Sequence, residues 1–372
     1  MKSFVKVATK KYEKGDRHQT QPDKDLLSVL ENAKPRIYVV GAGGAGGNTL
    51  KRLSELDLKG VSLVGLNTDV QALSQLNVDK KILLGKKLTK GFGAGSDPTI
   101  GEAAAKESKS DIEKMVKESD LVFITCGLGG GTGTGSAPVV AEIAKEHNVL
   151  SVGIVTLPFT VEGKTRMDHA LEGLARLRKN IDTVIVIPND KILEIAPDLP
   201  LDAAFKVADE ILANAVKGIT DMITKVGLIN LDYADLRTIL KSGGAAMMGL
   251  GESDPGATPE TRALQAAEDA LSSPLLDVNI STANRALINV VGGSDMTIKE
   301  AQTVVEAVAS KIDPDSHIIF GAMIDPEIPK TQIKAMVVIV GGFFQYIDKD
   351  KAKINTPKSE FEEDDLDIKY TG

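Results

Sequence analysis

Short apolar runs alternate with helical patterns over the first half of the chain. Runs rich in Val, Ile and Leu predict strands at 36–40, 61–66, 82–84, 121–126, 149–156 and 183–187. Between them, apolar residues at helical spacing predict helices from Asn48, at 98–117, at 138–147 and at 164–179. Nearly continuous apolar strands that alternate with helices are typical of a parallel sheet covered on both faces. The pattern therefore predicts a doubly wound parallel-sheet α/β domain over residues 35–200.

The pattern changes after residue 200. A helical stretch at 201–225, with Gly227 as its C-cap, is too long for an ordinary crossover, so residues 201–227 are interpreted as a long central helix. Beyond it, four strands and two helices predict a smaller α+β domain over 228–345. The strands are expected at 246–251, 285–291, 317–324 and 332–340, and the helices at 259–271 and 297–312.

Both ends of the chain lack this pattern. Residues 1–34 are predicted to be a polar arm with a short helix at 24–32. Residues 346–372 contain six acidic residues between Glu360 and Asp367. Such a run repels itself and is expected to remain disordered.

The composition narrows the class of protein. A length of 372 residues predicts two domains, and a net charge of −8 argues against nucleic acid as a direct partner. The single cysteine, Cys126, excludes an internal disulfide framework. The longest apolar run, 335–344, is too short to cross a bilayer, and the N-terminus has no apolar signal core. We therefore expect a cytoplasmic protein without direct membrane insertion.

Two glycine-rich segments each follow a predicted strand and precede a helix. Glycine lets backbone N–H groups approach an anion at a helix N-terminus, so both segments predict phosphate binding. The residues expected to bind phosphate in the longer segment are Gly127, Gly129, Gly130, Gly131, Thr132, Gly133, Thr134 and Gly135. Those in the shorter segment are Gly43, Gly44, Ala45, Gly46, Gly47 and Asn48.

The shorter glycine-rich segment, taken alone, favours another class of protein. It satisfies the dinucleotide fingerprint GxGxxG, and Asp69 lies at a plausible distance downstream for a ribose contact, as in a nicotinamide dehydrogenase. Such enzymes need no second glycine-rich loop. A second possible nucleotide motif is the sequence Gly163-Lys164-Thr165, which matches the last residues of a P-loop. The P-loop interpretation fails, because Pro158 lies at the position where that motif requires glycine.

The segment GGGTGTG at 129–135 resembles the signature loop of the tubulin and FtsZ superfamily of GTPases. The resemblance to FtsZ, and to its archaeal members in particular, covers about residues 35–342 and rests on five loops in the family's order. It implies the tubulin/FtsZ fold, binding of GTP and GDP, and Mg²⁺ held largely through phosphates and water. It also implies that the loop 93–98, through Ala94 and Gly95, helps to bind phosphate.

The same resemblance suggests the sugar and base contacts. Pro158 and the segment after it match the family's sugar loop, in which Glu162 would bind ribose and Arg166 ribose or phosphate. Phe205 and Asp209 lie on one helical face, where a ring can stack on a purine and a carboxylate can accept from guanine N1–H. By spacing alone, the preferred interpretation is core packing for Phe205 and a surface charge for Asp209, and only the family resemblance reverses it. Asn189, just past a strand, completes the predicted pocket, which would prefer GTP to ATP.

The segment 230–235 has two interpretations. Asp232 and Asp235 suit the N-cap and first turn of a helix, while Asn230, Asp232 and Asp235 together match the family's catalytic loop. In that family the loop lies at the far end of a helix about 37 Å long, so its acids would act on the next subunit's nucleotide.

The resemblance thus implies a head-to-tail filament of the cell-division ring, with assembly-stimulated GTP hydrolysis and membrane-tethering partners bound through the tail. A tubulin-like protein of cell shape remains an alternative.

Overall fold

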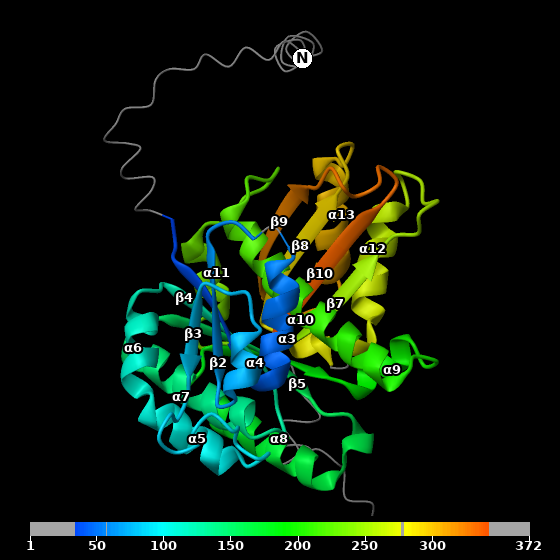
Figure 1. The fold of residues 1–372 in the computed structure, drawn as a ribbon. Helices are drawn as coiled ribbons and strands as arrows, with labels where there is room; N and C mark the ends of the chain where they lie inside the picture. The colour runs from blue at the N-terminus through cyan, green and yellow to red at the C-terminus, as the bar shows by residue number, and fades with distance from the viewer. Residues whose placement is uncertain (1–33, 57, 277–278, 342–372) are drawn as a thin grey trace, which may run out of the picture. The chain divides into compact units, whose positions relative to one another are not determined.

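The structure is a computed structural model that describes residues 34–56, 58–276 and 279–341 (Figure 1). Contacts divide the chain into residues 1–35 and 36–372, and the description below concerns the second unit. The predicted short helix at 24–32 and the predicted disordered tail at 346–372 lie outside the described residues.

One sheet of ten strands organises the described part of this unit, in the order β3-β2-β1-β4-β5-β6-β7-β10-β8-β9. The first six strands are all parallel, as the pattern predicts, and β6 also pairs in parallel with β7 over three residue pairs. β10 is antiparallel to both β7 and β8, which makes the second half mixed. The strands are β1 Ile37–Ala42, β2 Val61–Asn67, β3 Lys80–Leu83, β4 Leu121–Gly127, β5 Leu150–Leu157, β6 Thr183–Pro188, β7 Gly244–Glu252, β8 Arg285–Gly292, β9 His317–Ile324 and β10 Ile333–Val340.

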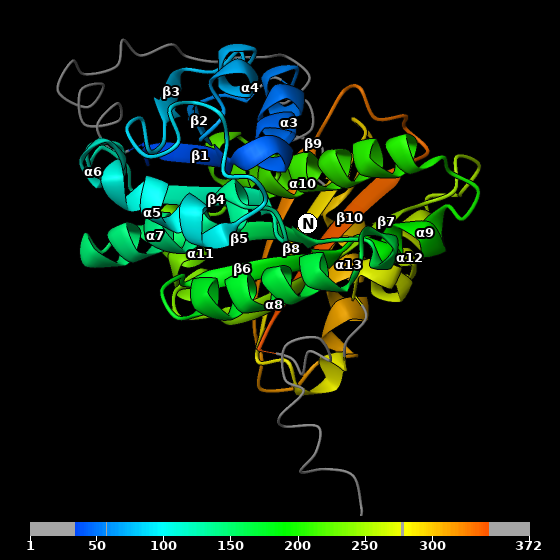
Figure 2. The same ribbon diagram turned by 60° about the horizontal axis from the view of Figure 1, so that its bottom comes forward.

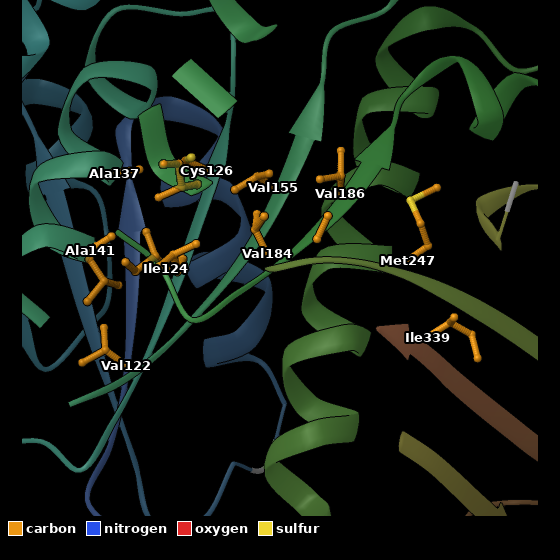
Figure 3. Close-up of a cluster of buried hydrophobic side chains, with 14 of the residues drawn as sticks. Val122, Ile124, Cys126, Ala137, Ala141, Val155, Val184, Val186, Met247 and Ile339 are labelled. Carbon is orange, nitrogen blue, oxygen red and sulfur yellow. The ribbon is translucent and has the colours of Figure 1, made fainter. Parts of the chain in front are cut away.

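Apolar side chains are buried on both faces of the sheet. Along β4, Val122, Ile124 and Cys126 belong to one hydrophobic cluster, and Leu121 and Phe123 belong to the other. Figure 3 shows the first cluster where β4 meets α7 (Thr132–Glu146). Complete burial raises the pKa of the Cys126 thiol to about 12, so this cysteine is a core residue and not a nucleophile.

Helices cover both faces (Figures 1 and 2). The central helix α10 contacts α3, β5, β8 and β9, so it joins the two halves of the sheet. The helices are α3 Gly43–Ser54, α4 Val70–Ser74, α5 Pro98–Glu107, α6 Lys109–Lys117, α7 Thr132–Glu146, α8 Lys164–Arg178, α9 Asp190–Ile195, α10 Leu201–Thr224, α11 Tyr233–Leu240, α12 Arg262–Ser272 and α13 Ile298–Ala309. Among the helices of the described ranges, none has the length and apolarity needed to cross a membrane.

Two predicted helix starts were wrong by five residues or more. α3 begins at Gly43 rather than Asn48, and α7 begins at Thr132 rather than Pro138. The low helix propensity of glycine suggested loops at these positions. Close packing against the strands instead favours glycine in the first turns: a Cβ on Gly46 would lie 2.5 Å from the carbonyl oxygen of Thr125.

The helix predicted at 98–117 is divided into α5 and α6. The break falls at Ser108, whose Oγ accepts a hydrogen bond from the backbone N–H of Gly85 at 3.1 Å. Two short helices, α4 and α9, were not predicted because they offer too few residues for a periodic pattern.

The close packing of α12 on β7 predicts that a larger side chain between them lowers the free energy of unfolding. A Cβ on Gly249 would lie 2.1 Å from the carbonyl oxygen of Ala270, so Gly249→Ala must push helix and strand apart. We expect the free energy of unfolding to fall by about 1–3 kcal/mol. Urea denaturation measures it, with Gly256→Ala as the control because an added Cβ there meets no atom within 4 Å. Equal losses in the two variants would contradict the packing argument.

Candidate functional site

The two glycine-rich segments meet at the carboxyl edge of the sheet. They follow β1 and β4, which are neighbouring parallel strands. A Cβ on Gly43, whose φ is +72°, would lie 2.9 Å from the backbone nitrogen of Gly133. A Cβ on Gly127 would lie 2.9 Å from the Cβ of Ala45. The N-termini of α3 and α7 are therefore adjacent, and their N–H groups and helix dipoles together suit the binding of an anion.

The loop 93–98 packs against this site. The backbone N–H of Gly93 donates to the Thr68 carbonyl at 3.1 Å, and the hydroxyls of Thr68 and Thr132 lie 2.7 Å apart. A Cβ on Gly131 would lie 2.9 Å from the Cβ of Ala94 and from the backbone nitrogen of Asp97. The loop 93–98 is thus in contact with the longer glycine-rich segment.

Asp69 and Asp97 have local partners. The Asp69 carboxylate accepts hydrogen bonds from the backbone N–H groups of Gln71 and Ala72 at 2.8 and 3.1 Å and caps α4. Asp97 caps α5, and its hydrogen bonds with Thr99 lower the pKa of the Asp97 carboxyl. Asp69 lies beside the loop 93–98 through a bridge with Phe92, but its carboxylate is engaged in capping.

The predicted sugar loop lies against the longer glycine-rich segment. Glu162 accepts from the backbone N–H of Phe159 at 2.8 Å and forms an ion pair with Arg166 at 3.0 Å. A Cβ on Gly129 would lie 2.7 Å from the carbonyl oxygen of Arg166, and φ at Gly129 is +100°. Arg166 therefore lies against the glycine loop in a close contact that only glycine permits, and Glu162 is held beside it by the ion pair.

A cavity brings together residues that are far apart in the sequence. The predicted residues that line it are Ala45, Gly127, Pro158, Glu162, Arg166, Asn189, Phe205 and Asp209. Sequence reasoning did not find Leu128, Thr156, Ala208 and Leu212, which complete its walls. The last two lie on the same face of α10 as Phe205 and Asp209, so the helical spacing contained this signal.

The polar groups of the cavity are incompletely paired. Asn189 is 4% exposed, and its Oδ1 has no hydrogen-bond partner among the described residues. Burial raises the pKa of the Asp209 carboxyl to about 7, partly opposed by a hydrogen bond with Asn48. The ring of Phe205 packs edge to face on that of Phe159, with 5.1 Å between the two ring centres. Phe205 keeps 37% of its surface exposed. A ring, a buried carboxyl and an unpaired amide oxygen can together bind a purine that carries hydrogen-bond donors.

The segment 227–235 lies at the other end of α10. Asn230 Oδ1 accepts from the backbone N–H of Gly227 at 2.6 Å, and Asp232 Oδ1 accepts from the backbone N–H of Asp235 at 2.7 Å as the N-cap of α11. The capping interpretation of these aspartates is therefore confirmed. Asn230, Asp232 and Asp235 are exposed. None of the three lines the cavity at the start of α10, a helix whose 24 residues span about 36 Å.

Comparison with known proteins decides the family. The model for the tubulin/FtsZ family GTPase domain matches residues 36–197, and that for the FtsZ family C-terminal domain matches residues 244–343. The chain is 55% identical to cell division protein FtsZ 1 of Thermococcus kodakarensis, over 87% of this chain and 86% of that protein. The chain belongs to the tubulin/FtsZ family. The resemblance found in its loops is confirmed, and the dehydrogenase alternative is wrong.

Two solved structures agree with this result. An FtsZ dimer from Methanocaldococcus jannaschii has a TM-score of 0.82 at 54% identity, covering 87% of this chain and 92% of that one. CetZ2 from Haloferax volcanii, at 21% identity and a TM-score of 0.73, covers 86% of this chain and 98% of its own and shows the fold alone. As an FtsZ-family protein, the chain is a GTPase of cell division and binds GTP and GDP.

The raised pKa of Asp209 predicts a pH-dependent affinity for GDP. Guanine donors need the ionised carboxylate, and half of these groups are protonated near pH 7. The affinity should stay level above the pKa and fall by up to about tenfold per pH unit below it, because binding must then release a proton.

Calorimetric titration with GDP from about pH 8 to about pH 5.5 measures this effect. Asp209→Asn serves as the control, since both proteins share the titration of the phosphate and only the carboxyl differs. The ratio of the two affinities should change with pH. A constant ratio would show that Asp209 does not bind the base.

Proposed function

We propose that this FtsZ-family chain forms head-to-tail filaments in which one subunit's segment 230–235 completes the GTP site of the next. The observation that supports this proposal is the position of Asn230, Asp232 and Asp235, which are exposed at the opposite end of α10 from the cavity. A helix of about 36 Å keeps them away from the nucleotide of their own subunit. The dimeric FtsZ from Methanocaldococcus jannaschii supports self-association.

In the proposed chemistry, the glycine-rich loops of one subunit and the segment 230–235 of its neighbour have separate roles. Backbone N–H groups at the starts of α3 and α7 stabilise the negative charge on the phosphates, while Asp232 and Asp235 of the neighbour orient and polarise the attacking water. Asn230 lies near the phosphates in this arrangement. The aspartates are already held by their capping hydrogen bonds, so little reorganisation is needed when the subunits meet.

Mg²⁺, when bound, neutralises charge on the phosphate oxygens. The described residues contain no group of three or more His, Cys, Asp or Glu side chains that could hold a metal ion. As the family resemblance implies, its ligands would be mainly phosphate oxygens and water.

Exposed apolar side chains favour contact between subunits, both beside the loop 93–98 and beside the segment 227–235. Phe92 is 89% exposed beside the loop 93–98, and Val226 is 94% exposed beside the segment 227–235. Large apolar groups on a surface are typical of interaction sites. Because two different surfaces meet, the contact is heterologous and need not close, so it extends into a filament.

In the cell, we place these filaments in the midcell division ring. We propose that residues 364–372, which contain Leu366, Ile368 and Tyr370 at alternating positions, bind membrane-tethering division proteins. The acidic residues around them would keep the segment available as a short peptide ligand.

Asp235→Asn should separate catalysis from nucleotide binding. The amide can still accept the capping hydrogen bond but carries no charge with which to polarise water. We expect GTP affinity to be nearly unchanged and turnover per subunit to fall by about a hundredfold. Phosphate release and equilibrium binding of GTP measure the two quantities.

The same assay tests the shared site. Turnover per subunit of the unchanged protein should rise with protein concentration, since each site needs a neighbour. A rate per subunit that stays constant down to concentrations at which light scattering detects no polymer would exclude the shared site.

Deleting Asp364–Gly372 tests the adaptor role of the tail. GTP hydrolysis and filaments in vitro should be preserved, because the deleted residues contribute to neither proposed surface, while the ring in cells should disperse. Fluorescence imaging of the truncated protein measures ring formation. Sharp midcell rings would show that attachment is encoded elsewhere in the chain.

A further inference from the structure

A second hollow lies between β3 and α6, and none of its lining residues belongs to the glycine-rich loops. Its volume is about 460 Å³, and we call it the β3–α6 groove. The groove is formed by Lys80–Leu83 and Lys86 on one side and by Asp111, Lys114, Met115 and Glu118 on the other. Figures 1 and 2 both show these two elements beside each other at one end of the sheet.

One wall of the groove is an open sheet edge. β3 is the first strand in the order and pairs with β2 on one side only. No other described strand or bridge pairs with its outer side. Unpaired backbone groups on an edge strand can accept an added strand from another segment.

The groove carries both positive charge and apolar surface. Lys80 is neutralised by Glu118 and lies 5.2 Å from the ring centre of Tyr38. Lys86 and Lys114 are exposed and form no ion pair with another described residue. Ile82 and Leu83, which also line the groove, are half-buried. The groove therefore suits a ligand with carboxylates and alternating apolar side chains.

We propose that residues 360–370 of the same chain bind in the β3–α6 groove as an added strand. This segment has six acidic residues from Glu360 to Asp367, followed by Ile368 and Tyr370, which alternate with Lys369. In an extended segment, Leu366, Ile368 and Tyr370 share one face, as the apolar part of the groove requires. Residues 1–33 fit less well, because they hold seven Lys and Arg against five Asp and Glu.

The chain is long enough for this contact. Its last described residue, Gly341, follows β10, the eighth strand in the order, while β3 is the first. At about 4.8 Å per strand the two lie about 34 Å apart across the sheet. Residues 342–359 can extend over about 60 Å, so they can cover this distance without strain.

Hydrogen exchange in the full chain, without nucleotide and at a concentration below assembly, tests the proposal. The test variant combines Glu362→Gln, Glu363→Gln, Asp364→Asn, Asp365→Asn and Asp367→Asn. The control variant neutralises three lysines of the spacer, with Lys349→Gln, Lys351→Gln and Lys353→Gln. Backbone amides of Lys80–Leu83 should exchange about tenfold faster in the test variant and at the original rate in the control. Equal rates in the unchanged protein and the test variant would overturn the proposal.

The groove side is tested in the same way. Lys86→Glu with Lys114→Glu should accelerate exchange in β3, while Lys299→Glu with Lys311→Glu, the same charge change on exposed residues of α13 and the turn after it, should not. Equal acceleration by both pairs would contradict a specific site.

Carbodiimide crosslinking of mixed ¹⁴N- and ¹⁵N-labelled chains then identifies the source of the bound segment. Crosslinks of Lys86 or Lys114 to residues 362–367 should join peptides of the same isotope. Crosslinks between different isotopes alone would show that the groove binds another copy and would overturn binding within the chain.

Discussion

The close approach of two strand-to-helix junctions, one after β1 and one after β4, is the contact on which the site depends. Several positions there have no room for a side chain: a Cβ on Gly41 would lie 2.3 Å from the Gly46 carbonyl oxygen, and one on Gly101 would lie 2.2 Å from that of Gly131. Glycine at so many positions costs conformational entropy. The buried strands on both sides of these junctions offset that cost, so a large parallel sheet is the condition for two glycine-rich loops packed this closely.

The strands of the first half were predictable because each is a local apolar run, and α10 because its pattern is long. Local patterns could not show that β10 lies between β7 and β8, since strand order depends on contacts between distant residues. The starts of α3 and α7 were misplaced for a related reason: tertiary contact, not propensity, makes those glycines helical.

In the candidate site, too, some features follow from local sequence and others depend on tertiary packing. The residues of the glycine loops and of the segment 230–235 follow motifs and could be named from the sequence. The burial that shifts the pKa of Asp209 depends on the packing of α3 against α10, which no spacing reveals. The unpaired oxygen of Asn189 likewise appears only when β6, β5 and α10 are brought together.

The segment before Asp232 also has a consequence for solubility. β9 is the last strand of the sheet, and Leu228 and Ile229 donate to the Ala322 carbonyl at 2.8 and 3.1 Å, while the N–H of Ala322 donates to Ile229. An open edge strand is a template for uncontrolled aggregation, and this bridge covers part of that edge. Substitutions that loosen the segment would thus leave this edge open to disordered association between subunits along their sides.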